Sequence, residues 1–210
     1  MKIIIILVLV ALIIWTIATW FAIRNIEEPK YTVESSNETY EIRIYEPYII
    51  AETIVSGSYR NALNDGFRNI ADYIFGNNTK SEKIAMTTPV KESEINDESE
   101  KISMTVPVIN QGDSQERRVS FVMPSKYTLE TIPKPNSDLV ELIEVPEKKV
   151  AVLRYGWYTN ERRIKEKTNL LLNKLQEDSV ELIGEASSAL YNPPFSIPFL
   201  LRNEILINIR

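Results

Sequence analysis

The side chains available for chemistry are limited, because the 210-residue chain contains no histidine and no cysteine. This absence excludes serine–histidine triads, thiol nucleophiles and zinc–thiolate sites, and it removes the commonest general base and metal ligand. Two groups of candidates remain. One is a pair of methionines in a repeated stretch, and the other is a polar cluster near the C-terminus, made of Tyr191, Arg202, Asn203 and Glu204.

The repeated stretch reads Lys83–Val90 in its first copy and Lys101–Val108 in its second. Alternating β-branched and methionine residues predict a strand in each copy, ending at its proline, which cannot donate to a ladder. An acidic loop, residues 91–100, separates the copies, so we expect a β-hairpin with Met86 and Met104 on one face. The two methionines either fill gaps in the core or line an apolar pocket.

The composition narrows the possible partners. The net charge of −5 argues against nucleic acid, because phosphate binding needs a basic face. The apolar fraction of 44% is sufficient for a core, and the length suits one domain with an appendage.

The appendage is an apolar segment at the N-terminus. Ile3 to Ile23 contains no charged residue, and at ~1.5 Å per residue it is long enough to cross a ~30 Å hydrocarbon core. Trp15 and Trp20 suit a membrane interface. A cleaved signal peptide is the alternative, but a good small-x-small cleavage site is lacking. We therefore expect residues 1–24 to be a single-pass signal anchor, with the soluble domain favoured on the outer side.

The remaining chain is predicted to be a linker followed by one domain. Residues 25–36 are polar and are interpreted as the linker, and the domain spans residues 37–210. Periodicity predicts helices over residues 58–75 and 159–176. Further strands are predicted at residues 40–45, 48–55, 117–123, 140–145, 149–155, 180–191 and 204–209.

This order of elements repeats itself. Gly57 and Tyr59 correspond to Gly156 and Tyr158 in a weak internal sequence repeat. We predict an α+β fold built from a duplicated β-α-β-β motif, in which one antiparallel sheet curls into a distorted barrel with two helices packed on it. The cleft where the halves meet is a usual place for a small ligand.

The chain resembles the SOUL haem-binding family from about Tyr40 to Ile209. The residues that carry the resemblance are Met86–Val90, Met104–Val108, Phe121–Ser125, Ile132–Pro135, Tyr191–Pro194 and Arg202–Glu204. The resemblance implies the duplicated barrel, which bacterial effector-binding domains share. It also implies non-covalent binding of a tetrapyrrole in an apolar cleft beside the first helix. Haem is the implied cofactor, here without a histidine ligand.

The first predicted helix supplies most candidate ligand contacts. Leu63, Phe67 and Ala71 form one stripe, which is either core or the wall of the cleft. Asn64 is expected to face the cleft. Arg68 is either a solvated charge or a clamp for a ligand carboxylate.

Outside that helix, the candidate contacts are Met86, Met104 and Glu204. The C-terminal cluster around Glu204 is either structural, with an Arg202–Glu204 ion pair, or it receives a polar or cationic ligand group. The second role is the one that an acidic residue plays in the related effector-binding domains.

Three functions are compatible with these residues. The first is a membrane-tethered tetrapyrrole-binding module, and the second is a binding or sensing module for another flat hydrophobic ligand. The third is a hydrolase that uses Glu204 with a tyrosine, which would require a raised pKa of that carboxyl group. We favour a ligand-binding module over an enzyme.

Overall fold

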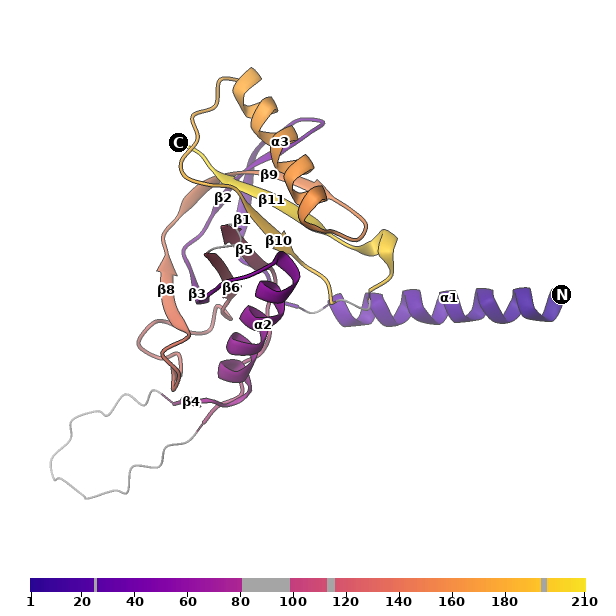
Figure 1. Cartoon of the computed structure of the whole chain (residues 1–210), viewed down its shortest axis with the longest axis horizontal. Coiled ribbons are helices and arrows are strands. Elements are labelled where there is room, and N and C mark those ends of the chain that lie inside the picture. Colours follow the sequence, from indigo (N-terminus) through magenta and orange to yellow (C-terminus); the bar gives the residue numbers. More distant parts are fainter. Residues whose placement is uncertain (25, 81–98, 113–115, 194–195) are drawn as a thin grey trace, which may run out of the picture.

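The computed structural model describes residues 1–24, 26–80, 99–112, 116–193 and 196–210 (Figure 1). The helices are α1 (Lys2–Ile23), α2 (Tyr59–Phe75) and α3 (Glu161–Glu177), with a short 3-10 turn η1 (Pro198–Leu200). The strands are β1 (Tyr31–Ser36), β2 (Glu41–Tyr45), β3 (Tyr48–Val55), β4 (Asn78–Thr79), β5 (Val108–Gly112), β6 (Arg117–Val122), β7 (Lys134–Pro135), β8 (Glu141–Val145), β9 (Lys148–Tyr155), β10 (Ser187–Leu190) and β11 (Asn203–Asn208).

Nine strands form one antiparallel sheet in the order β1-β2-β9-β11-β10-β5-β6-β3-β8. Without β1, this order is symmetric about the β10–β5 pair, because β2, β9 and β11 on one side match β8, β3 and β6 on the other. In chain order, the first half contains β2, β3, α2, β5 and β6, and the second contains β8, β9, α3, β10 and β11. The first strand of each half pairs with a strand of the other half, because β2 pairs with β9 and β8 pairs with β3. The predicted duplicated α+β fold is therefore confirmed, and its pseudo-twofold axis lies at the β10–β5 seam.

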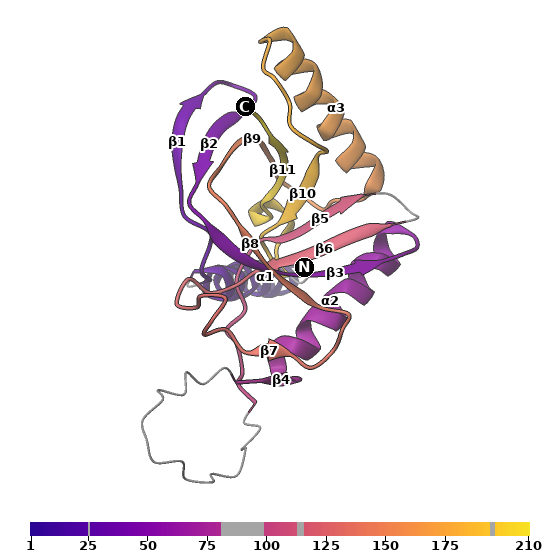
Figure 2. The same cartoon turned by 90° about the vertical axis from the view of Figure 1, so that its left-hand side faces the viewer.

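Both long helices of the domain cover the same outer face of the curled sheet (Figure 2). Ile70 and Ile74 of α2 are fully buried against Phe121 of β6, and Leu171 and Leu175 of α3 are buried against β9 and β11. The alternation of side chains along each strand places a second set of residues on the concave face. The predicted helices over residues 58–75 and 159–176 agree with α2 and α3.

Two predictions about the strands are wrong. Six residues of the segment interpreted as a linker form the edge strand β1, which pairs with β2. The second copy of the repeat is not a strand from Lys101 to Val106, because its backbone amides donate hydrogen bonds to groups outside the sheet. Ile102 N–H donates to the carbonyl of Ile74 at the end of α2, and Val106 N–H donates to the carbonyl of Glu27.

The strand in this region begins only after Pro107, at Val108. The first copy of the repeat, with Met86, lies outside the described residues, so the predicted hairpin is not tested there. The strand predicted over residues 180–191 is shorter, running from Ser187 to Leu190, and Leu182 forms an isolated bridge with Ile209.

Gly66 allows α2 to lie close to the sheet. A Cβ atom at this position would meet the Cβ and Cγ2 atoms of Val119 at 2.6 Å. Because side chains essentially never approach so closely, the glycine is required by the spacing between α2 and β6.

We predict that Gly66→Ala destabilises the domain by about 1–3 kcal/mol through overpacking. At an unobstructed helical position the same change would stabilise by about 1 kcal/mol. Urea unfolding measures the difference. Gly66→Ala should cost less when it is measured in a Val119→Ala background, because the obstructing methyl groups are absent there. A single Gly66→Ala variant that is more stable than the native chain would contradict the tight contact.

Candidate ligand-binding site

A cavity of about 480 Å³ lies on the helix side of the sheet, where the first turns of α2 and α3 meet. Its volume falls within the range of ~300–1,000 Å³ that is usual for small-molecule sites. The lining residues come from both halves of the fold: Ser58, Tyr59, Arg60, Leu63, Asn64, Tyr158, Thr159, Asn160, Glu161, Leu190, Asn192, Pro193, Leu201 and Asn203.

The duplication brings the two helix starts together. Strand β3 begins at Tyr48 and leads through Gly57, which has a positive φ of 115°, into α2. Strand β9 begins at Lys148 and leads through Trp157, which has a positive φ of 74°, into α3. Gly57 therefore corresponds to Trp157, one position later than the sequence repeat suggests. Asn203 Nδ2 donates to the carbonyl of Trp157 over 2.8 Å and holds this turn. Two positive helix ends thus face one cavity, which favours negatively charged ligand groups.

Polar groups lie beside the cavity at the seam. Ser188 of β10 stands opposite Asn110 of β5, and both are buried. The Arg117 guanidinium lies 5.4 Å from the centre of the Tyr59 ring and pairs with Glu161 over 3.2 Å. The Tyr59 hydroxyl, Asn110 Oδ1, Arg117 Nε and Ser188 Oγ are buried without a hydrogen-bond partner among the described residues. Such groups are costly unless a water molecule or a ligand satisfies them.

Burial raises the pKa of Tyr59 to about 12. The phenol therefore stays protonated at neutral pH, and its hydroxyl is a buried proton donor. It is a poor candidate for tyrosinate ligation of a metal, which needs the deprotonated form.

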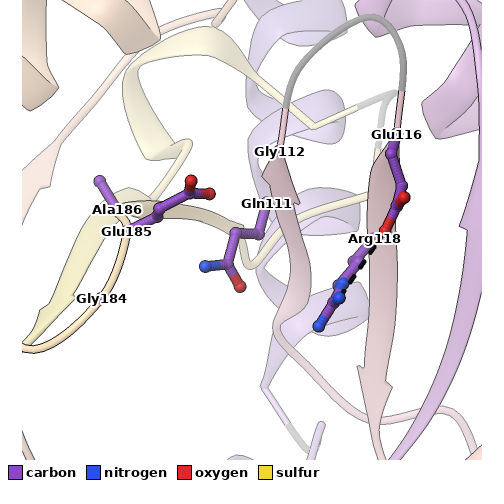
Figure 3. Close-up of a pocket in the computed structure, with 7 residues that line it drawn as sticks. All are labelled: Gln111, Gly112, Glu116, Arg118, Gly184, Glu185 and Ala186. Carbon is purple, nitrogen blue, oxygen red and sulfur yellow. Dashed lines mark ion pairs between the residues drawn. The ribbon is translucent and has the colours of Figure 1, made fainter.

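A second cavity of about 740 Å³ lies at the opposite end of the β5–β10 pair (Figure 3). Its described lining is Gln111, Gly112, Glu116, Arg118, Gly184, Glu185 and Ala186. Glu116 and Arg118 are exposed and pair over 3.7 Å. Because none of these side chains is a large apolar group, this cavity does not suit a hydrophobic ligand.

A family model described as SOUL heme-binding protein matches residues 26–208. The chain belongs to this family. No curated protein matches the chain at the sequence level.

Solved structures share the fold of this SOUL domain at low sequence identity. The C-terminal domain of EcmrR superposes with a TM-score of 0.58 at 6% identity, covering 86% of this chain and 98% of that domain. An uncharacterised conserved protein from Listeria innocua gives 0.50 at 12% identity, covering 84% and 94%. A structure described as a hydrolase from Listeria innocua gives 0.49 at 11% identity, with the same coverage. At these identities the likeness concerns the fold alone.

The SOUL cavity includes two of the site residues predicted on the first helix. Leu63 and Asn64 line it. Phe67 is 43% exposed and its ring centre lies 5.4 Å from that of Phe121. Arg68 is exposed and pairs with Asp65, while Ala71 is buried in the domain. Phe67, Arg68 and Ala71 are outside the described lining, so their contact with a ligand stays a prediction.

Arg60 is the basic residue of α2 that lines the cavity. It precedes Asn64 by one helical turn and therefore shares its face. The sequence analysis proposed Arg68 as the basic residue that could clamp a ligand carboxylate. Arg68 follows Asn64 by one helical turn, whereas Arg60 precedes it. Of the two methionines, Met104 is about half exposed and away from the cavity lining, and Met86 lies outside the described residues.

Glu204 lies on the opposite face of the sheet from this cavity, because it alternates with Asn203 along β11. It is fully buried, and its carboxylate accepts from Arg43 Nη1 at 3.0 Å, from Arg202 Nε at 2.9 Å and from the Tyr191 hydroxyl at 2.6 Å. Burial and the Glu204 carboxylate raise the pKa of Tyr191 well above its usual value, so it stays a proton donor. This geometry corresponds to the structural interpretation of the cluster, with Arg43 as a partner that the sequence did not indicate.

We predict that Arg43→Met lowers the free energy of unfolding by about 3–5 kcal/mol, because it removes one partner of a buried carboxylate. Arg68→Met is the matched control. It breaks an exposed pair with Asp65 and should cost at most about 1 kcal/mol. Urea unfolding at neutral pH compares the two variants, and equal effects would show that the Glu204 network contributes no more than a surface pair.

Proposed function

We propose that this SOUL protein is a membrane-tethered binder of haem or a related tetrapyrrole, which it holds non-covalently in the cavity between α2 and α3. The observation that carries the proposal is that cavity, which is built from both halves of the fold and combines apolar walls with positive helix ends. Leu63, Leu190 and Leu201 offer apolar surface to the ring. The burial of several hundred Å² at ~25 cal/mol per Å² would offset the cost of association.

Arg60 and the two helix starts contribute positive charge to the cavity, and the Glu161 carboxylate in its lining pairs with Arg117. A tetrapyrrole such as haem carries propionate groups, and these would pair with Arg60 while the ring packs against the leucines. The lining thus fits an amphiphilic ring that is apolar over its faces and anionic at one edge.

The lining does not supply a strong axial ligand for iron. The chain lacks histidine and cysteine, and the described cavity residues include no methionine. Among the described residues there is also no group of three or more acidic side chains placed to hold a metal ion. This favours a second candidate, a module that binds or senses a metal-free flat hydrophobic ligand in the same cavity.

A hydrolase is less well supported, although one structure of similar fold is described as a hydrolase. Glu204, the acid that such a reaction would use, is neutralised by two arginines on the concave face. SOUL is a ligand-binding family, and the cavity gives this chain a place for a ligand.

The proposed tether is α1. Among the described residues, this helix is long and apolar enough to cross a membrane. Its apolar segment, Lys2–Phe21, is almost entirely outside the domain, with 6% buried. Its 22 residues span ~33 Å, close to the ~30 Å of a hydrocarbon core. We propose that it stays uncleaved and holds the domain on the outer side.

We predict that tetrapyrrole binding depends little on the metal. Haem, zinc porphyrin and the metal-free ring should bind within about tenfold of each other, a difference of ~1.4 kcal/mol. Titration of a tag-free chain, followed by the Soret band or by porphyrin fluorescence, measures this. A polyhistidine tag would itself supply ligands and must be absent. A low-spin six-coordinate spectrum, or haem binding a thousandfold tighter than the metal-free ring, would contradict the proposal.

We also predict that Arg60→Ala weakens binding of protoporphyrin about tenfold through the loss of a propionate partner. The dimethyl ester of the same ring lacks the charges and should bind the native chain and the variant equally. Arg68→Ala, two turns along α2 and outside the cavity lining, is the control and should change neither affinity. If Arg68→Ala has the larger effect, the ring lies further along α2 than this cavity.

A further inference from the structure

The domain contacts the predicted membrane span at Thr19. Thr19 of α1 is fully buried, whereas the described side chains around it are mostly exposed. Its hydroxyl oxygen accepts a hydrogen bond of 3.2 Å from the backbone N–H of Ile197. In Figure 1, the yellow turn that precedes β11 accordingly lies beside the domain-proximal end of α1.

The position of Thr19 sets the depth of this turn. Thr19 precedes the end of α1 at Ile23 by about one turn, which is ~6 Å at ~1.5 Å per residue. If α1 spans the hydrocarbon core, Thr19 lies near the boundary between acyl chains and headgroups. Trp20, the next residue, is of the type enriched at that boundary. The turn bonded to Thr19 must lie at the same level.

The residues of the turn suit the boundary between acyl chains and headgroups. Ile197 to Leu201 reads Ile-Pro-Phe-Leu-Leu, with no charged or polar side chain, and Phe199 at its tip is 63% exposed. The backbone offers few free donors, because proline has none and the amides of Leu200 and Leu201 donate within the turn, to Ile197 and Pro198. The cost of moving this backbone out of water is therefore low.

The chain that leaves α1 is fastened to the domain as well. The Glu28 carboxylate accepts from Arg202 Nη1 at 2.8 and 2.9 Å, and the Glu27 carboxylate accepts from Ser125 N–H at 2.8 Å. These contacts follow α1 directly, so the domain cannot swing freely at the end of its span.

We propose that the Ile197–Leu201 turn is a second membrane contact, in which Phe199 inserts at the bilayer surface beside α1. The inference rests on the proposed tether. It fixes the orientation of the domain, because α1 and the turn together define which side faces the lipid. Leu201 also lines the ligand cavity, so one wall of that cavity is continuous with the membrane contact.

The test uses the full chain in phosphatidylcholine vesicles, with bromine on the lipid acyl chains as a contact quencher of tryptophan. Variants with a single tryptophan are made by changing Trp15, Trp20 and Trp157 to phenylalanine, and then adding Phe199→Trp. A second variant keeps only Trp20 and reports on the span. The control is Phe75→Trp in the same background, since Phe75 is similarly exposed at the end of α2 that lies away from α1.

We expect the Phe199→Trp variant to show quenching that is strongest when bromine is near the headgroup end of the chain, with emission shifted to shorter wavelength than in the control. Phe75→Trp should show no quenching. Quenching of Trp20 without quenching at position 199 would overturn the second contact and leave the tether intact. Absence of quenching at Trp20 would overturn the tether, and the inference with it.

Discussion

The buried carboxylate of Glu204 constrains much of this structure. A charge without solvent must be paired and hydrogen-bonded, and its partners are Arg43 of β2, Tyr191, and Arg202, which directly precedes β11. Arg202 also binds Glu28, so the network extends to the chain that follows α1. Paired charges and tyrosines thereby occupy part of the concave face of the sheet, beside an apolar cluster of Val150, Val152 and Leu206. The space for a ligand is on the opposite face, between the helices.

That space exists because the fold is duplicated. The seam between β10 and β5 joins the two halves of the sheet, and the helix starts from each half converge beside it. The same symmetry creates the polar atoms at the seam that lack partners, since Ser188 and Asn110 face each other where the halves meet. In the proposed function, a ligand in this cavity would be held by burial, by the positive helix ends and by Arg60. It can leave without breaking a coordinate bond.

Regular periodicity made most of the fold predictable. Strand β3 and the two domain helices were located to within two residues, because their apolar faces are packed and so leave a clear pattern. Strand β1 was missed because Tyr31–Ser36 is an edge strand that is exposed at nearly every position. Leu63, predicted from the helical stripe, and Asn64, expected to face the cleft, both line the cavity, and their contact with a ligand stays a prediction. The residues that face them across the cavity could not be found, since only the pseudo-twofold axis brings Tyr158 and Leu201 to α2. Arg43 pairs with a glutamate far along the chain, and no local pattern records this.

A single stretch of chain connects these features. Its described residues, 190–193 and 196–204, form one wall of the cavity, the apolar turn against Thr19 and the buried end of the charge network. Because Arg202 and Glu204 are fixed by charge pairs on one side of this stretch, and Asn203 is fixed to Trp157 on the other, the position of the turn is determined by the folded domain. The orientation of α1 relative to the domain therefore depends on the contact between Thr19 and Ile197 together with the contacts of Glu27 and Glu28 after the span. This explains how a chain whose span and last strand are far apart in sequence can present its ligand cavity at a fixed angle to the helix.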